Sequence, residues 1–366
     1  MKIELIDLKK RYKDESKEIL SSIKKVLSKG HLVLTEELYN FEKNICSYTN
    51  SRYCLGLNSG TDALMMSLWS LGIGKNDEVI TSPTSFVATI GAIVHVGAKP
   101  VFADIRNDLN IDPDKIEKKI TKKTRAIMPV HWAGKMCEMD KIYKIARKYK
   151  LHIIEDAAQG MGSYYKKKHA GNFSDIAAFS THPLKNLNGL GDGGFITTNN
   201  KNLYNKIKLY RNHGLKSRDN VNIFGVNSRL DVLNAEVLNF RLKKLKNIIL
   251  KRRKNIELYR KLIKTNKIVI PDDDRDYFSS YTIFVCLCEK RNQLQKFLSK
   301  KGIQSLIYYG VPLHKHVAYK KYKKIKEILP VAEKLAKKVL ALPHHQNMTE
   351  KQIRYVCKEI NNFYLS

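Results

Sequence analysis

Apolar positions recur with helical spacing near the N-terminus and with strand–helix alternation beyond it. Ile19, Ile23 and Val26 mark a helix within residues 15–50, and Gly30 separates it from a second helix over Glu36–Tyr48. The pattern beyond residue 50 then predicts strands in RYCLGL, DEVITSP, KPVFADI, TRAIMPVH and HIIEDAA, with helices between them. Strands that alternate with helices of this length predict right-handed βαβ units and a mostly parallel sheet, an α/β fold class.

The last third of the chain shows a different pattern. DIAAFSTH and GGFITTNN add two β-like runs, and the sequence from about residue 200 to Leu245 is helical in pattern. A long basic helix over 246–264 is followed by strand-like YTIFVCLCE, helical NQLQKFLSKKG, strand-like IQSLIYY and a last helix over 349–363. We therefore expect a large domain over 1–245, which includes the N-terminal helices, and a small α+β domain over 246–366.

Charge and cysteine content limit the classes of function. The 67 Lys and Arg against 35 Asp and Glu give a formal charge of +32, but the lysines are scattered and accompany no nucleic-acid-binding motif. We expect a solvated basic surface and no nucleic-acid partner. The sequence has no transmembrane run or signal peptide, which predicts a cytoplasmic protein without membrane insertion. Cys286 and Cys288 share one face of a strand, as core residues do, and the six cysteines predict no metal site.

Chemically capable residues follow several of the predicted strands. Ser59, Gly60 and Thr61 form a strand-to-helix turn, where a helix N-terminus can bind an anion. Asp156 ends the strand HIIED, and Ser180 and Lys185 follow the next β-like run. Each feature alone has a structural explanation, such as a helix cap for Asp156. Together they form the order of a pyridoxal phosphate site, which needs a lysine amine, an acidic partner for the pyridine nitrogen and phosphate donors.

The sequence resembles the DegT/StrS-type nucleotide-sugar aminotransferases, a branch of the fold-type I pyridoxal phosphate enzymes. The likeness covers nearly the whole chain. It is carried by GHLVLTEELYNFEKNICSYTNSRYCLGLNSGTDAL, DEVITSPTSFVATIGAIVHVGAKPVFADI, EDAAQGMGS, FSTHPLKNLNGLGDGGFITTN, RNHG, GVNSRLDVLNAEV, YYGVPLH and VLALPHH. The resemblance implies a fold-type I large domain and a small C-terminal domain.

The resemblance also implies roles for individual residues. Lys185 would bind the cofactor aldehyde and Asp156 the pyridinium nitrogen. The other cofactor contacts implied are Gln159 near the ring hydroxyl, Phe86 stacked on the ring, Gly60, Thr61 and Ser180 at the phosphate, and Asn227 at the phosphate of the neighbouring subunit. A site shared in this way implies a homodimer. Phe86 could instead be a core residue.

Substrate contacts are implied for a further group of residues, with a looser match to the family. Arg229 could instead be a structural ion-pair partner, and VHWAGKMCEMD departs from the usual family pattern, which leaves the sugar open. The residues expected to contact substrate are His131, Trp132, His182, Arg229, Tyr309, His314 and His316.

The activity implied is transfer of an amino group from L-glutamate to a nucleotide-linked keto sugar through the pyridoxal and pyridoxamine forms of the cofactor. The amino sugar would serve surface polysaccharide or glycoconjugate synthesis. Two alternatives remain open. In related pyridoxamine-dependent sugar dehydratases a histidine replaces the cofactor lysine, whereas Lys185 is present here. A non-catalytic regulator that uses the basic surface is the other alternative.

Overall fold

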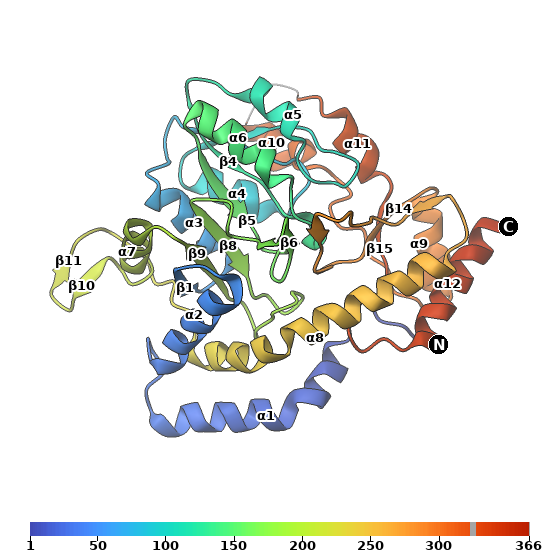
Figure 1. The fold of residues 1–366 in the computed structure, drawn as a ribbon, viewed down its shortest axis with the longest axis horizontal. Helices are drawn as coiled ribbons and strands as arrows, with labels where there is room; N and C mark the ends of the chain where they lie inside the picture. The colour runs from blue at the N-terminus through green and yellow to red at the C-terminus, as the bar shows by residue number, and fades with distance from the viewer. Residues whose placement is uncertain (323–326, 366) are drawn as a thin grey trace.

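A seven-stranded sheet forms the centre of the larger part of the chain (Figure 1). The computed structural model describes residues 1–322 and 327–365. In spatial order the strands are β1, β9, β8, β5, β4, β2 and β3, and β9 runs antiparallel to the other six. The mostly parallel sheet predicted from the sequence is thereby confirmed. The strands are β1 Tyr53–Leu57, β2 Glu78–Thr81, β3 Lys99–Phe102, β4 Thr124–Met128, β5 His152–Asp156, β8 Ile176–Ser180 and β9 Gly194–Thr198.

Helices cover both faces of this sheet, because both faces of its strands are apolar. On β8, Ile176 and Ala178 belong to one buried cluster, whereas Ala177 and Phe179 belong to another on the opposite face. Helices α3, α4 and α7 supply the first cluster, and α2, α6 and α8 supply the second. The helices of this part are α1 Leu8–Lys29, α2 Glu36–Thr49, α3 Gly60–Ser70, α4 Val87–His95, α5 Pro113–Ile116, α6 Met139–Tyr149, α7 Lys201–Tyr210 and α8 Val232–Leu262.

The C-terminal part has the expected α+β composition. A three-stranded antiparallel sheet carries Cys286 and Cys288 on β14, and both are buried in one apolar cluster, as predicted. Residues 303–309 do not form the expected regular strand. Among the described residues, the β-pairing of this segment is limited to single bridges, from Ile303 to Ile3 and from Leu306 to Ala341. The elements are β12 Ile268–Val269, β14 Val285–Cys288, β15 Val339–Ala341, α9 Arg291–Lys300, α10 Val317–Tyr322, α11 Pro330–Ala336 and α12 Glu350–Leu365.

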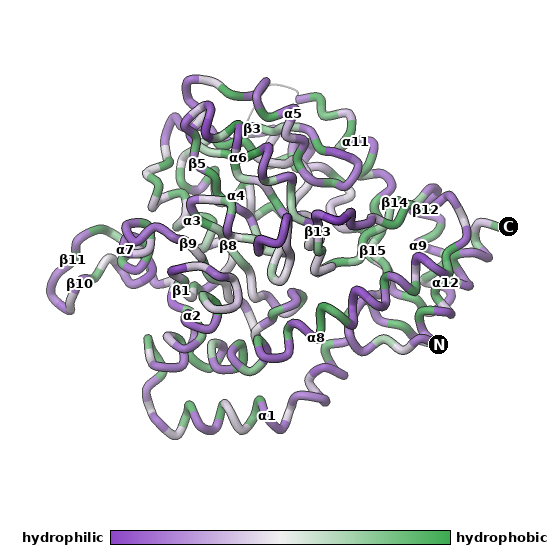
Figure 2. The backbone as a smooth tube through the Cα atoms, viewed as in Figure 1, coloured by the Kyte–Doolittle hydropathy of each residue, from purple (hydrophilic) through white to green (hydrophobic). Residues whose placement is uncertain are grey.

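Helix α8 joins the two parts without a break at residue 245 (Figure 1). Leu245 packs in a cluster of the large part, whereas Ile256 and Tyr259 pack in the C-terminal cluster. Polar and apolar residues alternate along the helix (Figure 2). The N-terminal Ile3 also packs in the C-terminal cluster, although the sequence assigned it to the large domain. The domain division near 245 stays a prediction.

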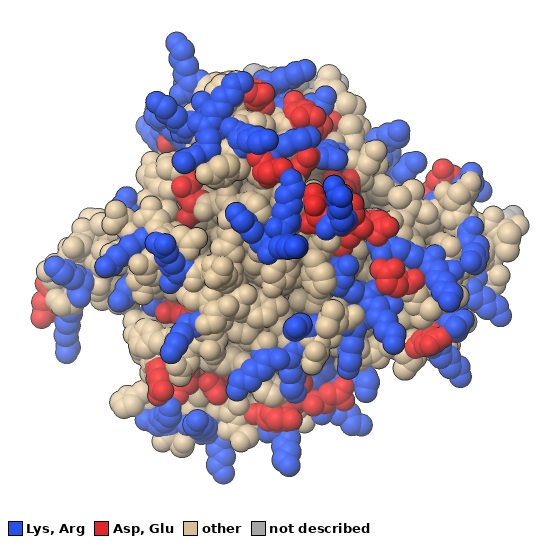
Figure 3. All heavy atoms as spheres, in the orientation of Figure 1, with Lys and Arg blue, Asp and Glu red and all other residues tan. Residues whose placement is uncertain are grey.

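Two small β-structures lie outside the main sheets. A hairpin arm of β10 Leu215–Ser217 and β11 Asn220–Val221 projects from the large part (Figure 1). A three-stranded sheet combines β6 Tyr164–Tyr165, β7 Lys168–His169 and β13 Tyr277–Phe278. Over the face drawn in Figure 3, Lys and Arg side chains are scattered rather than gathered into one patch. Among the described residues, no helix has the length and apolar character needed to cross a membrane.

Candidate functional site

The carboxyl ends of the parallel strands meet at one edge of the sheet, where ligands bind in open α/β folds. A cavity of about 270 Å³ opens there. Residues that follow β1, β2, β5 and β8 line it, together with Ile6 from the N-terminal segment and residues 282–283 and 308–309 from the C-terminal part. Of the residues predicted from the sequence, those that line the cavity are Gly60, Thr61, Phe86, Asp156, Gln159, Ser180, His182, Lys185 and Tyr309.

Asp156 is the buried acid of the cavity, with 3% of its surface exposed. Thr89 donates a hydrogen bond from Oγ1 to Asp156 Oδ2 at 2.7 Å, and the Ala158 amide donates to Oδ1 at 3.2 Å. Burial raises the pKa of Asp156, whereas these donors and the charge of Lys185 act in the opposite direction. The carboxylate is therefore held in place by two donors, with Lys185 opposite it.

Lys185 supplies the amine of the same cavity. Its backbone amide bonds to the His182 carbonyl at 2.8 Å, which tightens the loop that follows β8. Burial lowers the pKa of Lys185 to about 8, although the negative charge of Asp156 acts to raise it. At pH 7 about one tenth of an amine with this pKa is neutral, far more than of an ordinary lysine, and the neutral amine is the form that acts as a nucleophile.

The turn between β1 and α3 forms a close cradle for an anion. Ser59 caps α3 by accepting the Asp62 amide at 3.0 Å, and the first amides of the helix lie at the cavity. A Cβ atom at Gly60 would meet Ser180 Cβ at 2.8 Å, and one at Gly194 would meet the Ser59 carbonyl carbon at 2.5 Å. Both positions therefore require glycine for the backbone to approach this closely.

Polar and aromatic side chains complete the cavity wall. Gln159 accepts the Ala133 amide at 2.8 Å through Oε1, so its amide nitrogen faces the Tyr309 hydroxyl at 3.5 Å. Phe86 stands at the start of α4 with 57% of its surface exposed, and its ring centroid lies 6.3 Å from that of Tyr309. The structure thus does not bury Phe86 in the core; it lies at the cavity.

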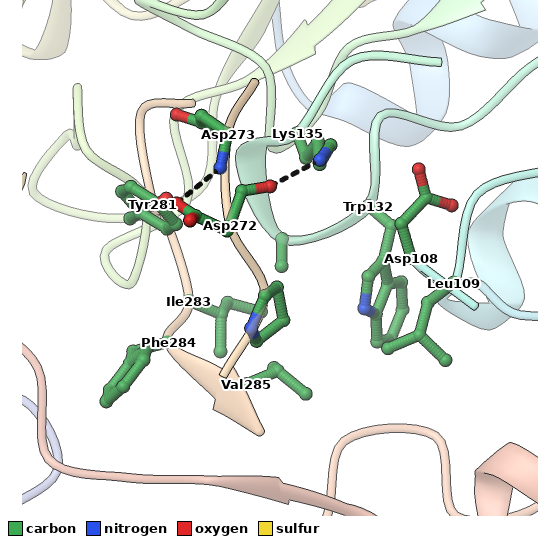
Figure 4. A pocket seen from close by; sticks show the side chains of 12 residues that line it. Asp108, Leu109, Trp132, Lys135, Asp272, Asp273, Tyr281, Ile283, Phe284 and Val285 are labelled. Carbon is green, nitrogen blue, oxygen red and sulfur yellow. Dashed lines mark hydrogen bonds between the residues drawn. The ribbon is translucent and has the colours of Figure 1, made fainter. Parts of the chain in front are cut away.

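Two predicted substrate contacts, His131 and Trp132, lie behind the cavity instead of in it. His131 is fully buried: its Nδ1 accepts the Cys137 amide at 3.3 Å, so Nε2 carries the proton and donates to Glu155 Oε2 at 2.7 Å. Trp132 lines a separate small crevice with Ile283 and Val285 (Figure 4). Its ring lies 4.7 Å from the Tyr309 ring and supports that ring from behind.

Two further predicted contacts, His314 and His316, also do not line the cavity. His314 is buried and bonds to Glu333 at 3.1 Å, and His316 bonds to the Val311 carbonyl at 3.1 Å. These bonds hold the turn before α10. This placement favours structural roles for both histidines.

Asn227 and Arg229 lie together in a second concavity, lined also by Asn58 and by Leu32 and Val33. Arg229 Nε donates to Asn227 Oδ1 at 3.0 Å, and its Nη1 donates to Asn212 at 3.2 Å. Among the ion pairs of the described residues, none involves Arg229, so the alternative of a structural ion pair gains no support.

Sequence reasoning missed several residues of the cavity. Thr89 bonds Asp156, and Ser85 lies one helical turn before Thr89, with their hydroxyl oxygens 2.6 Å apart. Both residues lie in DEVITSPTSFVATIGAIVHVGAKPVFADI, the segment that also contains Phe86. Their separation by four positions is the spacing of neighbouring side chains on a helix and could have identified them. Ile6, Thr282 and Ile283 come from distant parts of the chain. No local pattern identifies them.

The cavity fits pyridoxal phosphate. A glycine-lined helix N-terminus suits the phosphate, the buried Asp156 carboxylate suits a protonated ring nitrogen, and the Lys185 amine, at a pKa of about 8, suits an aldehyde.

Comparison with known proteins agrees with this fit. The model of the DegT/DnrJ/EryC1/StrS aminotransferase family matches residues 13–361. The chain is 38% identical to a dTDP-3-amino-3,6-dideoxy-alpha-D-galactopyranose transaminase of Aneurinibacillus thermoaerophilus, over 99% of both chains. It is 36% identical to a "pleiotropic regulatory protein" of Geobacillus stearothermophilus, over 100% of this chain and 99% of the relative.

Solved structures show the same fold. DesV of S. venezuelae, in complex with a ketimine intermediate, matches with a TM-score of 0.96 and 34% identity, over 99% of this chain and 98% of DesV. NtdA of Bacillus subtilis, with bound cofactor PMP, matches with a TM-score of 0.89 and 32% identity, over 95% of this chain and 82% of NtdA. The chain therefore belongs to the DegT/DnrJ/EryC1/StrS aminotransferase family.

Proposed function

We propose that this protein is a pyridoxal phosphate-dependent aminotransferase that moves an amino group from L-glutamate to a nucleotide-linked keto sugar. The observation that carries the proposal is the cavity that joins Lys185, Asp156 and the N-terminus of α3 at one edge of the sheet. The transaminases among the relatives support the substrate class. We further propose that the product serves surface polysaccharide or glycoconjugate synthesis and that the protein is cytoplasmic.

Lys185 and Asp156 have different chemical roles in the proposed reaction. The cofactor, when bound, carries the amino group and withdraws electrons from the reacting carbon. Lys185 Nζ, neutral in part because burial lowers its pKa to about 8, can bond the cofactor aldehyde and, when released, move a proton at the reacting carbon. Asp156 would hold a proton on the ring nitrogen, with Thr89 fixing its Oδ2.

The side chains at the cavity mouth would bind and orient the ring and the sugar. Phe86 is exposed now and would be covered if its ring stacks on the cofactor. Gln159 has its oxygen engaged by the Ala133 amide, so its amide nitrogen is free to donate to a ring hydroxyl or to Tyr309. His182 and Tyr309 lie on the cavity wall where a sugar would enter.

The test of this function uses the full chain loaded with cofactor. Addition of L-glutamate should change the visible absorbance band and release 2-oxoglutarate, and a panel of nucleotide-linked keto sugars should then yield an aminated product by mass spectrometry. Lys185→Ala should retain the fold by circular dichroism and lose turnover. A sugar product that has lost water without gaining nitrogen would favour the dehydratase. No cofactor band and no response to L-glutamate would favour a non-catalytic regulator. The name of one relative, the "pleiotropic regulatory protein" of Geobacillus stearothermophilus, is consistent with that alternative.

We also propose that the active enzyme is a homodimer in which Asn227 completes the cofactor phosphate site of the other subunit. Asn227 lines a concavity outside the cavity of its own chain. Apolar residues beside it are exposed: Leu32 at 45%, Val33 at 57% and Phe224 at 97% of their surface. Exposed apolar surface of this kind is typical of a contact with another chain.

Subunit exchange tests the shared site. Lys185→Ala chains and Asn227→Asp chains should each be inactive, the second because a carboxylate would face the phosphate. In a mixed dimer with shared sites, one site carries both changes and the other carries neither, so mixing should restore part of the activity. A mixture that exchanges subunits and recovers no activity contradicts the shared site, as does a fully active monomer.

A further inference from the structure

Helix α8 contacts the segment that follows Lys185 through three buried polar side chains. Asn234, Arg241 and Arg252 are separated by seven and eleven positions, so they lie along nearly one side of the helix. All three are buried, with 7%, 4% and 2% of their surfaces exposed. We call these three residues the polar row of α8.

The row binds the segment at successive points. Asn234 accepts the Leu190 amide at 3.0 Å and donates to the Asp192 carbonyl at 2.8 Å. Arg241 donates to the carbonyls of Asn188 at 2.7 Å and Gly189 at 3.0 Å.

Arg252 binds closest to the catalytic lysine. Its Nη1 donates to Asn186 Oδ1 at 2.5 Å, and Asn186 directly follows Lys185. The row therefore holds the segment from one residue to seven residues beyond Lys185.

Arg252 also connects this segment to the opposite wall of the cavity. The same Nη1 lies 3.3 Å from the Thr282 carbonyl, and Thr282 Oγ1 donates to the Gln159 carbonyl at 2.8 Å. Asn186 Nδ2 donates to the Ser280 carbonyl at 3.1 Å. One buried guanidinium thus links α8, the Lys185 loop and residues 280–282.

The charge of Arg252 is not explained by an ion pair. Over residues 1–322 and 327–365, no carboxylate pairs with it, and its Nε has no hydrogen-bond partner. Burial lowers the pKa of Arg252 to about 9. Burying a charge without a counter-charge is unfavourable, and an apolar side chain of similar size would avoid this cost. Stability alone therefore does not account for an arginine here.

We propose that the polar row of α8, with Arg252 as its main member, positions Lys185 in the cavity by fixing the segment from Asn186 to Asp192. The proposal rests on the proposed function only in taking Lys185 as the catalytic amine. The other titratable groups that line the cavity are Asp156 on β5, His182 in the Lys185 loop, Asp192 at the end of the segment, and Tyr308 and Tyr309, and none of them is a member of the row. A loosened segment lets water reach the amine, which then titrates closer to the ordinary lysine value.

The test measures the titration of Lys185 in the full chain freed of cofactor. Acetic anhydride labels neutral amines, and peptide mass mapping gives the labelled fraction of Lys185 across pH. Arg252→Gln should move the midpoint up by at least about half a pH unit relative to the unchanged chain. Arg252→Lys, which keeps one donor for Asn186, should give a smaller shift. Lys251→Gln is the matched control, because Lys251 is exposed on the same helix, and it should leave the midpoint unchanged.

The outcomes separate the alternatives. A folded Arg252→Gln chain with an unshifted midpoint would overturn the proposal. If that variant does not fold, Asn234→Ala decides, because its two contacts lie at the less buried end of the segment. An unshifted Lys185 midpoint in Asn234→Ala would also overturn the proposal, whereas a raised midpoint would support it. The labelling involves no sugar and no glutamate, so a failed aminotransferase assay leaves this result standing, and the reverse also holds.

Discussion

The hydroxyl of Thr89, which bonds Asp156 Oδ2 and lies 2.6 Å from Ser85 Oγ, gives a prediction about the buried acid of the site. Thr89→Val removes the hydroxyl and keeps the shape of the side chain. Both partners are buried, at 1% and 3% exposure, and the oxygens lie 2.7 Å apart. A hydrogen bond to a charged group contributes about 1.5–3 kcal/mol, which corresponds to a rise of about one to two units in the pKa of Asp156.

The sign of the pH dependence follows from burial. Burial already raises the pKa of Asp156 above the ordinary value of 3.8, so the folded chain binds this proton more tightly than the unfolded chain. The contribution of the group to stability is therefore complete below pH 3.8 and is lost as the pH rises through the folded pKa. Thr89→Val should make that loss larger, with the full difference of about 1.5–3 kcal/mol reached once Asp156 is ionised.

Urea unfolding of the cofactor-free chain at several pH values measures this difference. Thr84→Val is the matched control, because the Thr84 hydroxyl is also buried but has no hydrogen-bond partner within residues 1–322 and 327–365. The control should leave the unfolding free energy within about 0.5 kcal/mol of the unchanged chain, or raise it. Thr89→Ser should restore most of the stability. Equal unfolding free energies for Thr89→Val and Thr84→Val across the pH range would refute the reasoning.

Two further predictions concern the phosphate cradle and the lysine. Gly60→Ala should speed cofactor release on ultrafiltration at least about tenfold, because its Cβ would meet Ser180 Cβ at 2.8 Å, whereas Gly91→Ala, with open space around it, should not. Cofactor uptake by the apo chain, followed by absorbance, should quicken with rising pH with a midpoint near pH 8, because bonding the aldehyde requires neutral Lys185. A rate independent of pH between about 6.5 and 9 would contradict the assignment of Lys185.

The sequence carries the information for the sheet and for the residues at its edge. Asp156 and Ser180 directly end strands, and Gly60 begins a helix, so the alternation of elements places them together once the sheet is parallel. The features that the sequence did not predict correctly depend on contacts between segments far apart in the chain. Residues 303–309 have the composition of a strand, but the N-terminal Ile3 and strand β15 offer only single bridges to them. The buried pair of His131 and Glu155 likewise depends on two strands meeting in space.

Burial acts on the pKa values of Lys185 and Asp156, which both line the cavity, in opposite directions. It lowers the pKa of Lys185, which favours the neutral amine that a nucleophile needs. It raises the pKa of Asp156, which works against the carboxylate that a ring nitrogen needs. The effect of burial on the pKa of Lys185 is therefore only partly opposed, by the charge of Asp156. The effect of burial on Asp156 is opposed by hydrogen bonds from the Thr89 hydroxyl and the Ala158 amide. This asymmetry explains why a hydroxyl from α4 belongs to the site: without it, burial would raise the pKa of Asp156 further and oppose the carboxylate form.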